Sequence, residues 1–248
     1  EPRGVNGINV SKLTLEEARG VKLQFDSRGF RVSSIGSPVG KTKLTDSFDD
    51  DLGVLSHVLE IAEIFETKYV RMFSPFIPEG EKPEKYRDEV LRRMKGYADA
   101  ARGRDVILLH ENEGSNIYGQ TARRCLDIFE SIGSDKLKAV FDPGNFAYAD
   151  HDALEAYEIL DDYIEYVHIK DSTGNKVIVP AGKGNVQYKE IFKRLKKKGR
   201  NYFLSLEPHL SSFTGFAEID GSIKLQEGNN KEKFVFAFNC LKEIVDSI

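Results

Sequence analysis

The sequence predicts an α/β fold of the (β/α)8, or TIM, barrel type. Its length of 248 residues is the usual size of one such barrel. Short apolar runs alternate with longer helical patterns, which indicates a parallel sheet with helices on its faces. Ligand-type side chains follow several of the apolar runs directly. We therefore expect residues 1–248 to form a single barrel domain.

The expected strands are apolar runs that end in polar, Gly-bearing or Pro-bearing loops. In chain order they cover residues 30–35, 69–73, 106–109, 137–141, 166–169 and 202–206. Residues 2–5 read as the tail of a further strand. This leaves the chain one strand short of the eight that a closed barrel needs. We expect the first β/α unit to be missing from this chain, the alternative being a barrel closed in a different way.

Helices are expected between these strands, and a capping box marks the N-terminus of the first one. In Thr14-Leu15-Glu16-Glu17, Thr14 can accept from first-turn amides while Glu17 reaches back to the Thr14 N–H. That helix should end near Gly29. Periodic apolar patterns predict the others at residues 48–66, 83–101, 121–131, 152–160, 186–198 and 231–245.

The amino-acid composition argues against nucleic acid and membrane as partners. The net charge of −4, with 40% hydrophobic and 31% charged residues, is ordinary for a globular protein and lacks the positive field that selects nucleic acid. The basic run over residues 193–200 lies on an expected helix, where a solvated outer face is the simpler explanation. The sequence has no apolar run as long as a membrane span and only two cysteines, so we expect a cytoplasmic protein that binds neither membrane nor nucleic acid.

Four ligand-type residues follow four successive expected strands: Glu111, Asp142, His168 and Glu207. The C-terminal ends of parallel barrel strands open onto one face, so residues at these ends converge even when they are far apart in sequence. Three carboxylates buried together raise one another's pKa values unless a cation compensates them. Singly, each carboxylate could be a helix cap or an ion-pair partner, and His168 could be a core histidine.

Together the four predict a site for one divalent metal ion. Three carboxylates and one imidazole suit Mn²⁺, Mg²⁺ or Co²⁺, with Zn²⁺ as an alternative. No cysteine belongs to the set, which argues against a structural thiolate site.

The motifs around these residues resemble the sugar phosphate isomerase/epimerase family, within the xylose-isomerase-like TIM barrel superfamily. The resemblance spans most of the chain and depends on the order of several short motifs. These are Leu108-Leu109-His110-Glu111-Asn112-Glu113, Phe141-Asp142-Pro143-Gly144-Asn145, Val167-His168-Ile169-Lys170-Asp171, Pro180-Ala181-Gly182-Lys183-Gly184 followed by Tyr188, and Leu204-Ser205-Leu206-Glu207-Pro208-His209.

This resemblance implies an isomerase or epimerase that acts on a sugar or sugar phosphate in carbohydrate metabolism. It implies that Glu111, Asp142, His168 and Glu207 bind the metal ion, and that Glu111 and Glu207 also move protons to and from a metal-stabilised enediolate. Two glutamates on opposite faces of the sugar give epimerisation, whereas one base acting on both carbons gives aldose–ketose isomerisation. A homo-oligomer is a possibility that rests on the family alone.

Further candidates could bind the sugar: Asn145, Lys170, His209, Arg71 and Lys41. Asn145 stands where better-studied ketose epimerases of the superfamily carry a histidine, and the arginine that they place after the metal-binding histidine has no counterpart here. Lys170 and His209 could donate to sugar oxygens, and Lys41 could meet a phosphate. The alternatives are rim ion pairs for Lys170 and His209, solvation for Lys41, and for Arg71 a pair with a carboxylate such as Glu113.

Two other functions stay open on the same fold. One is a dehydratase of the inosose type, in which the metal-polarised ketone acidifies a neighbouring C–H and a hydroxyl leaves. The other is a catalytically inert sugar-binding barrel, which the missing β/α unit favours and the complete ligand set disfavours. The endonuclease branch needs extra histidine ligands for a trinuclear zinc site, and Asn145 stands at one of those positions.

Overall fold

A computed structural model describes residues 1–173, 176–209 and 230–248. Within it the chain forms two compact units, each described by itself. Unit 1 comprises Glu1–Glu111, Ser115–Gln120 and Arg124–Val140, and unit 2 comprises Asn112–Gly114, Thr121–Arg123 and Phe141–Ile248 as far as it is described. The expectation of a single domain stays a prediction.

The α/β fold class is confirmed by parallel strand pairing within each unit: β3, β4, β5 and β6 pair in chain order in unit 1, and β7 pairs with β10 in unit 2. Sequential strands that lie side by side with helical crossovers are what the alternating pattern predicts. The strands are β3 Ile35–Gly36, β4 Tyr69–Met72, β5 Ile107–Glu111, β6 Leu137–Phe141, β7 Ile164–Ile169 and β10 Phe203–Leu206.

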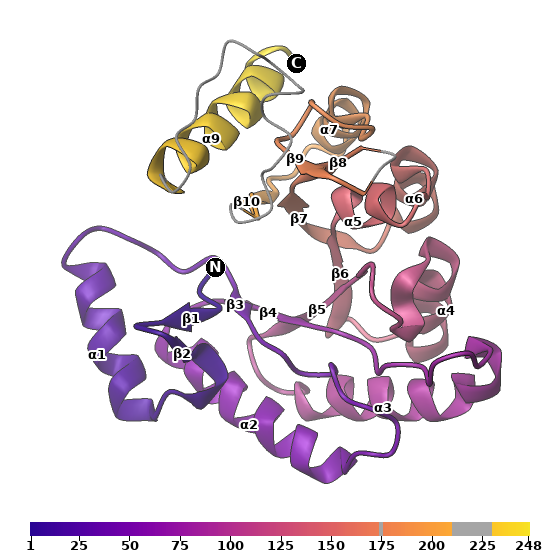
Figure 1. The fold of residues 1–248 in the computed structure, drawn as a ribbon. Coiled ribbons are helices and arrows are strands. Elements are labelled where there is room, and N and C mark those ends of the chain that lie inside the picture. The colour runs from indigo at the N-terminus through magenta and orange to yellow at the C-terminus, as the bar shows by residue number, and fades with distance from the viewer. Residues whose placement is uncertain (174–175, 210–229) are drawn as a thin grey trace. The chain divides into compact units, whose positions relative to one another are not determined.

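In unit 1, helix α2 packs beside strand β4 and beside helix α3 (Figure 1). Apolar residues of α2, including Leu55, Val58 and Leu59, are buried there with Val70 and Met72 of β4. The helical elements assigned to this unit are η1 Val10–Lys12, α1 Leu15–Asp26, α2 Phe48–Ile64, η2 Pro83–Tyr86, α3 Arg87–Ala100, η3 Tyr118–Gln120 and most of α4 Ala122–Ile132.

The predicted start of α1 is confirmed. Thr14 Oγ1 accepts from the Glu17 backbone N–H at 3.1 Å, and the Thr14 backbone N–H donates to Glu17 Oε2 at 2.8 Å. The helix ends at Asp26, and Gly29 follows with a φ of 73°, a left-handed conformation that glycine adopts without strain.

Two strand expectations in unit 1 are wrong in extent or role. Of the expected strand 30–35 only Ile35 pairs with β4, together with Gly36 just beyond that range. Phe30 is 62% exposed, and its ring centroid lies 6.5 Å from that of Phe25. The segment 2–5 is not assigned to the parallel sheet, although Pro2 O accepts from the Gly36 N–H of β3 at 3.0 Å. Instead, β1 Gly4–Val5 pairs antiparallel with β2 Ile8–Asn9 in a short hairpin.

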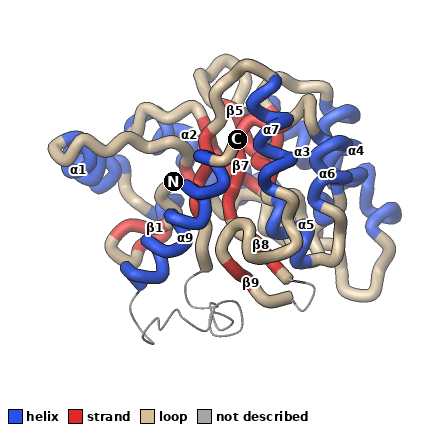
Figure 2. Tube along the Cα trace, turned by 90° about the horizontal axis from the view of Figure 1, so that it is seen from above, coloured by secondary structure: helices blue, strands red, loops and turns tan. Residues whose placement is uncertain are grey.

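In unit 2, β7 and β10 pair in parallel from Tyr166↔Phe203 to Ile169↔Leu206. Helices α5 Pro143–Tyr148, α6 Ala153–Leu160, α7 Tyr188–Lys197 and α9 Asn230–Asp246 belong to this unit. A two-stranded hairpin of β8 Asp171–Ser172 and β9 Ile178–Val179 lies beside α5 (Figure 2). The sequence did not predict α5 or this hairpin, whereas the other helices match their expected ranges to within a few residues.

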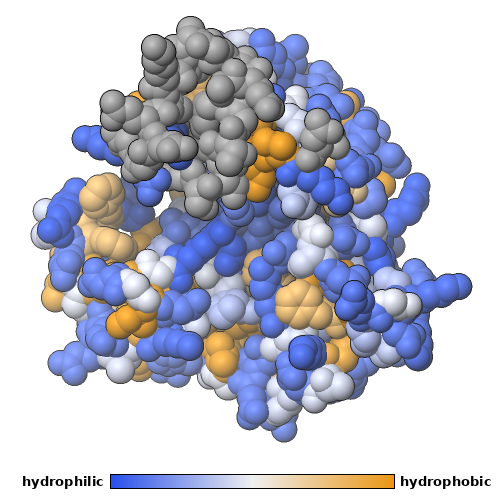
Figure 3. Space-filling model, in the orientation of Figure 1, coloured by the Kyte–Doolittle hydropathy of each residue, from blue (hydrophilic) through white to orange (hydrophobic). Residues whose placement is uncertain are grey.

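The surface agrees with the composition. The face shown in Figure 3 carries mostly hydrophilic side chains. Basic residues of the run 193–200 form ion pairs: Arg194 with Glu158 and Glu190, and Arg200 with Glu165. Both cysteines, Cys125 and Cys240, are buried and free. Among the described residues, no helix combines the length and apolar character needed to cross a membrane.

Candidate metal centre

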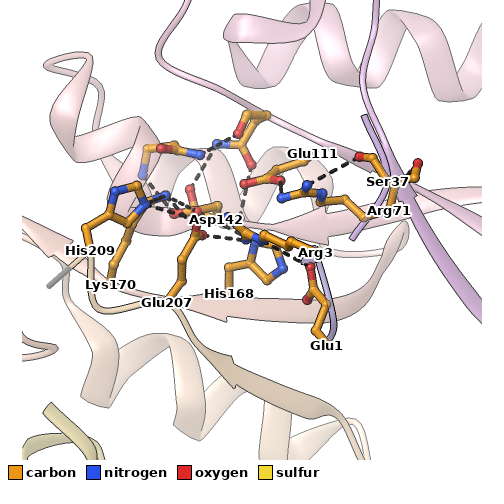
Figure 4. Close-up of polar contacts among 12 residues, drawn as sticks. Glu1, Arg3, Ser37, Arg71, Glu111, Asp142, His168, Lys170, Glu207 and His209 are labelled. Carbon is orange, nitrogen blue, oxygen red and sulfur yellow. Dashed lines mark hydrogen bonds and ion pairs between the residues drawn. The ribbon is translucent and has the colours of Figure 1, made fainter. Parts of the chain in front are cut away.

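Three of the predicted ligands lie together in unit 2, each at the C-terminal end of a strand. Asp142 directly follows β6 and caps α5, with its Oδ1 accepting from the Asn145 backbone N–H at 2.9 Å. His168 is the penultimate residue of β7. Glu207 follows β10, and its backbone N–H donates to Ile169 O at 2.9 Å, which continues the strand pairing. The parallel sheet therefore aims all three side chains at one place (Figure 4).

The spacing of the three side chains suits a metal ion. Each offers a ligand atom within 4.8 Å of the others, with His168 Nδ1 3.4 Å from Glu207 Oε2 and 3.8 Å from Asp142 Oδ2. Ligands that sit about 2.0–2.2 Å from one ion are separated from each other by about 3–4 Å. The side chains are 0%, 1% and 12% exposed for Asp142, His168 and Glu207, so water screens this cluster weakly.

Asn112 holds Asp142 in place. Its Nδ2 donates to the Asp142 backbone O at 2.9 Å, and its Oδ1 accepts from the Asp142 backbone N–H at 3.0 Å. Asn145, expected to contact substrate, donates its side-chain Nδ2 to Asn112 O at 2.8 Å. Through this hydrogen bond Asn145 supports the same cluster. A contact of Asn145 with substrate stays a prediction.

Lys170 and His209 both lie against the three residues, as Figure 4 shows. Lys170 Nζ is 2.9 Å from Asp142 Oδ2, 3.1 Å from Glu207 Oε2 and 3.4 Å from His209 Nε2. His209 Nε2 is also 3.0 Å from Glu207 Oε1. The ammonium, whose side chain is 5% exposed, thus offsets part of the negative charge of the two carboxylates.

In unit 1, Glu111 at the end of β5 forms a buried ion pair with Arg71. Arg71 Nη1 donates to Glu111 Oε2 at 3.1 Å, and Nη2 donates to Ser37 O at 3.3 Å. The two side chains are only 9% and 4% exposed. The partner of Arg71 is therefore Glu111, and the alternative pairing with Glu113 is not the one observed.

Lys41 lies over the ring of Phe73, with its Nζ 4.3 Å from the ring centroid, and the Arg71 guanidinium lies 4.8 Å from the same centroid. The loop before Lys41 is tight, because a Cβ on Gly40 would come within 1.8 Å of Phe73 O. The cation–π contact gives Lys41 a fixed position in unit 1. Binding of a phosphate by Lys41 stays a prediction.

Two residues of unit 2 organise the site without having been singled out from the sequence. Asp171 accepts backbone N–H groups of Ser172, Gly182, Gly184 and Val186, and burial raises the pKa of its carboxyl to about 6 although these four donors lower it. Burial likewise raises the pKa of Tyr188 well above its usual value, so its hydroxyl stays protonated. Asp171 and Tyr188 stand in the motifs quoted above, but the sequence does not show which backbone groups they contact.

Comparison with known proteins adds the family context. The model of the family described as xylose isomerase-like TIM barrel matches residues 3–230, which confirms the predicted fold class and resemblance. No curated protein sequence matches the chain.

Three solved structures illustrate the similarity. D-psicose 3-epimerase from Clostridium cellulolyticum H10 has a TM-score of 0.72 and 14% identity, with 94% of this chain and 84% of the other covered. The IolI protein, solved with a zinc atom, has a TM-score of 0.74 and 14% identity, covering 96% and 84%. The probable 3-DHS dehydratase AsbF from Bacillus anthracis has a TM-score of 0.67 and 18% identity, covering 82% and 80%. At these identities the likeness shows a shared fold.

Proposed function

The chain belongs to the xylose isomerase-like TIM barrel family, and from this premise we propose that it is a divalent-metal-dependent isomerase or epimerase of a sugar or sugar phosphate. The observation that carries the proposal is the convergence of Asp142, His168 and Glu207 in unit 2. A buried carboxylate, a part-buried carboxylate and a buried imidazole have the chemistry and spacing of metal ligands, and the single positive charge of Lys170 offsets only part of the charge of the two carboxylates.

The donor set fits a single hard or borderline ion. Carboxylate oxygens and a neutral imidazole suit Mn²⁺, Mg²⁺, Co²⁺ or Zn²⁺. When bound, the ion would polarise the sugar carbonyl and offset negative charge on its oxygens during proton transfer.

Glu111 is proposed as the fourth ligand. It ends β5 in the same way that the other three residues end or follow their strands, and the family resemblance assigns it to the metal. Glu111 is 3% exposed, and its Oε2 lies 3.1 Å from Arg71 Nη1, so the carboxylate stands in a buried and charged environment.

Glu207 and Glu111 are the proposed acid/base residues. Glu207 would remove a proton from the carbon next to the sugar carbonyl, and Glu111 would return one on the other face in an epimerase. Transfer between adjacent carbons by a single glutamate would give isomerisation instead. Lys170 and His209, which contact Glu207, are the proposed hydrogen-bond donors to sugar hydroxyls or to a phosphate.

A dehydratase is the second candidate, and the position of His209 favours it. His209 Nε2 is 3.0 Å from Glu207 Oε1, so an imidazole stands next to the proposed base. Such a pair could remove a proton from carbon and protonate a departing hydroxyl. The two candidates differ in whether water leaves the substrate.

Metal analysis followed by NMR in D₂O with a panel of ketoses, ketose phosphates and inososes tests this proposal. Exchange of a C–H without loss of water supports an isomerase or epimerase, and loss of water supports a dehydratase. Metal binding with no exchange for any sugar that binds would support the inert barrel instead.

Glu207→Gln sharpens the test. The amide cannot act as a base, so exchange should fall by about 10²-fold or more even if the metal stays bound. Glu165→Gln is the matched control, because Glu165 lies in an ion pair with Arg200 on the surface of unit 2. Full turnover in Glu207→Gln would contradict the proposed mechanism.

A further inference from the structure

Lys170 lies just beyond the end of the strand pairing, and one side chain satisfies both of its backbone groups. The register of β7 with β10 ends at Ile169↔Leu206. The Lys170 backbone N–H donates to Tyr188 Oη at 3.2 Å, and the Tyr188 hydroxyl in turn donates to Lys170 O. Buried backbone groups need hydrogen-bond partners, and the Tyr188 hydroxyl provides them for Lys170 where the strand pairing ends.

Tyr188 is itself firmly held. It begins α7, is 2% exposed, and its ring lies 5.3 Å from that of Phe192. The loop that leads into it is folded around Asp171, whose carboxylate accepts three N–H groups of this loop at 2.9, 3.1 and 3.0 Å. A Cβ on Gly184 of that loop would come within 2.3 Å of Asp171 Oδ1, so the loop approaches as closely as glycine permits.

The opposite side of Lys170 is closed by α5. A Cβ on Gly144 would come within 2.4 Å of Lys170 O and 2.6 Å of Lys170 Cγ. The Lys170 backbone is thus enclosed between the first turn of α5 and the Tyr188 hydroxyl. Its side chain extends from this fixed base to place Nζ 2.9 Å from Asp142 Oδ2 and 3.1 Å from Glu207 Oε2.

We propose that Tyr188 is a positioning residue that acts through Lys170: its hydroxyl fixes the Lys170 ammonium against Asp142 and Glu207 and thereby sets the affinity of the site for a divalent cation. This inference rests on the proposed function, because it takes Asp142 and Glu207 to be metal ligands.

Electrostatics gives the direction of the effect. An ammonium at 2.9–3.1 Å from two ligand oxygens repels an incoming cation and shares the oxygens that the cation needs. Removing the Lys170 charge should therefore tighten metal binding. Loss of the Tyr188 hydroxyl should tighten it less, because the ammonium remains but is held less firmly.

The test compares Mn²⁺ affinity, measured by electron paramagnetic resonance of the free ion, in four proteins: the unchanged chain, Tyr188→Phe, Lys170→Met and the double variant. Lys170→Met should bind Mn²⁺ about tenfold more tightly, since a like charge beside the ion is removed. Tyr188→Phe should bind about threefold more tightly, and the double variant should equal Lys170→Met, since coupled residues are not additive.

Tyr118→Phe is the control. Tyr118 is also buried, and its hydroxyl donates to Asp127 Oδ2 at 2.8 Å in unit 1. It should lose a similar amount of stability without a change in Mn²⁺ affinity. If Tyr188→Phe behaves like Tyr118→Phe, or if its effect persists unchanged beside Lys170→Met, Tyr188 is only structural and the inference is overturned.

A second measurement does not need the metal. Reductive methylation with formaldehyde, followed by peptide mass spectrometry, reports how readily the Lys170 amine leaves its partners. Tyr188→Phe should speed methylation of Lys170 severalfold, and Tyr118→Phe should not. Unchanged methylation would overturn the positioning role. If the unchanged chain binds no divalent ion, the proposed function and the effect on affinity both fail, while faster methylation would still show that Tyr188 positions Lys170.

Discussion

Asn112 forms two hydrogen bonds with the backbone of Asp142: its Nδ2 donates to Asp142 O at 2.9 Å, and its Oδ1 accepts from the Asp142 N–H at 3.0 Å. Asp142 begins the turn from β6 into α5, so its backbone lies where regular strand pairing has ended. A reciprocal pair of hydrogen bonds fixes its orientation more firmly than one would. Asp142 is a proposed metal ligand, and a hydrogen-bonded support behind such a ligand commonly increases metal affinity.

Asn112→Ala should therefore weaken divalent-metal binding by about 10- to 100-fold. The variant should also lose about 1–3 kcal/mol of stability, because two buried backbone groups lose their partner. Titration with Mn²⁺ and denaturant unfolding measure the two effects. Asn116→Ala removes a comparable side-chain hydrogen bond, from Asn116 Nδ2 to Ile77 O in unit 1, and should leave metal affinity unchanged. Equal affinities in both variants would show that Asn112 does not support the site.

Arg71→Met should destabilise the protein by about 3–5 kcal/mol in the presence of a chelator, since it leaves the Glu111 carboxylate buried without its cationic partner. If Glu111 is a metal ligand, adding Mn²⁺ should restore more stability to this variant than to the unchanged chain. Denaturant unfolding with and without Mn²⁺ measures both effects.

Arg104→Met provides the comparison for Arg71. Arg104 pairs with Glu63 at 2.7 Å, but the two side chains are 31% and 55% exposed. Its loss should cost less than about 1 kcal/mol and should not respond to Mn²⁺. An Arg71→Met variant that gains nothing extra from Mn²⁺ would argue against Glu111 as a ligand.

His110 should make the protein sensitive to mild acid. Burial lowers the pKa of its imidazole from 6.5 to about 4, with a smaller opposing effect of Glu111. Below pH 6.5 the unfolded chain binds a proton at this histidine and the folded chain does not, so stability falls as pH drops from 6.5 towards 4.

His110→Leu removes this contribution. On going from pH 7 to pH 5, the variant should lose about 2 kcal/mol less stability than the unchanged chain. Urea unfolding in the presence of a chelator, which keeps metal binding from contributing, measures the difference. Parallel losses in the two proteins would mean that His110 takes up its proton in the folded state.

The sequence predicted the sheet best where apolar runs have sharp boundaries. Residues 137–141 form β6 as expected, because a polar Ser134-Asp135-Lys136 segment precedes the run and Asp142-Pro143 ends it. The run 30–35 is interrupted by the polar residues Arg31, Ser33 and Ser34, and the exposed residues Phe30 and Arg31 lie outside the sheet. Helix α5 was missed because six residues are too few to show a helical period.

The candidate site was predictable in its chemistry and less so in its supports. Glu111, Asp142, His168 and Glu207 could be found because strand ends identify them one at a time. The roles of Asn112, Asp171 and Tyr188 depend on tertiary hydrogen bonds across 11 to 30 residues, for example from Gly182 and Val186 to Asp171. Periodicity and strand position carry no information about such partners.

The most direct measurement is the metal content of the chain after loading with Mn²⁺ or Zn²⁺ and gel filtration. We predict about one ion per chain for the unchanged protein and for His209→Gln, and almost none for Asp142→Asn or His168→Gln, which remove ligands. An unchanged protein that retains no ion, or an Asp142→Asn variant that retains a full equivalent, would contradict the metal centre on which the proposed function depends.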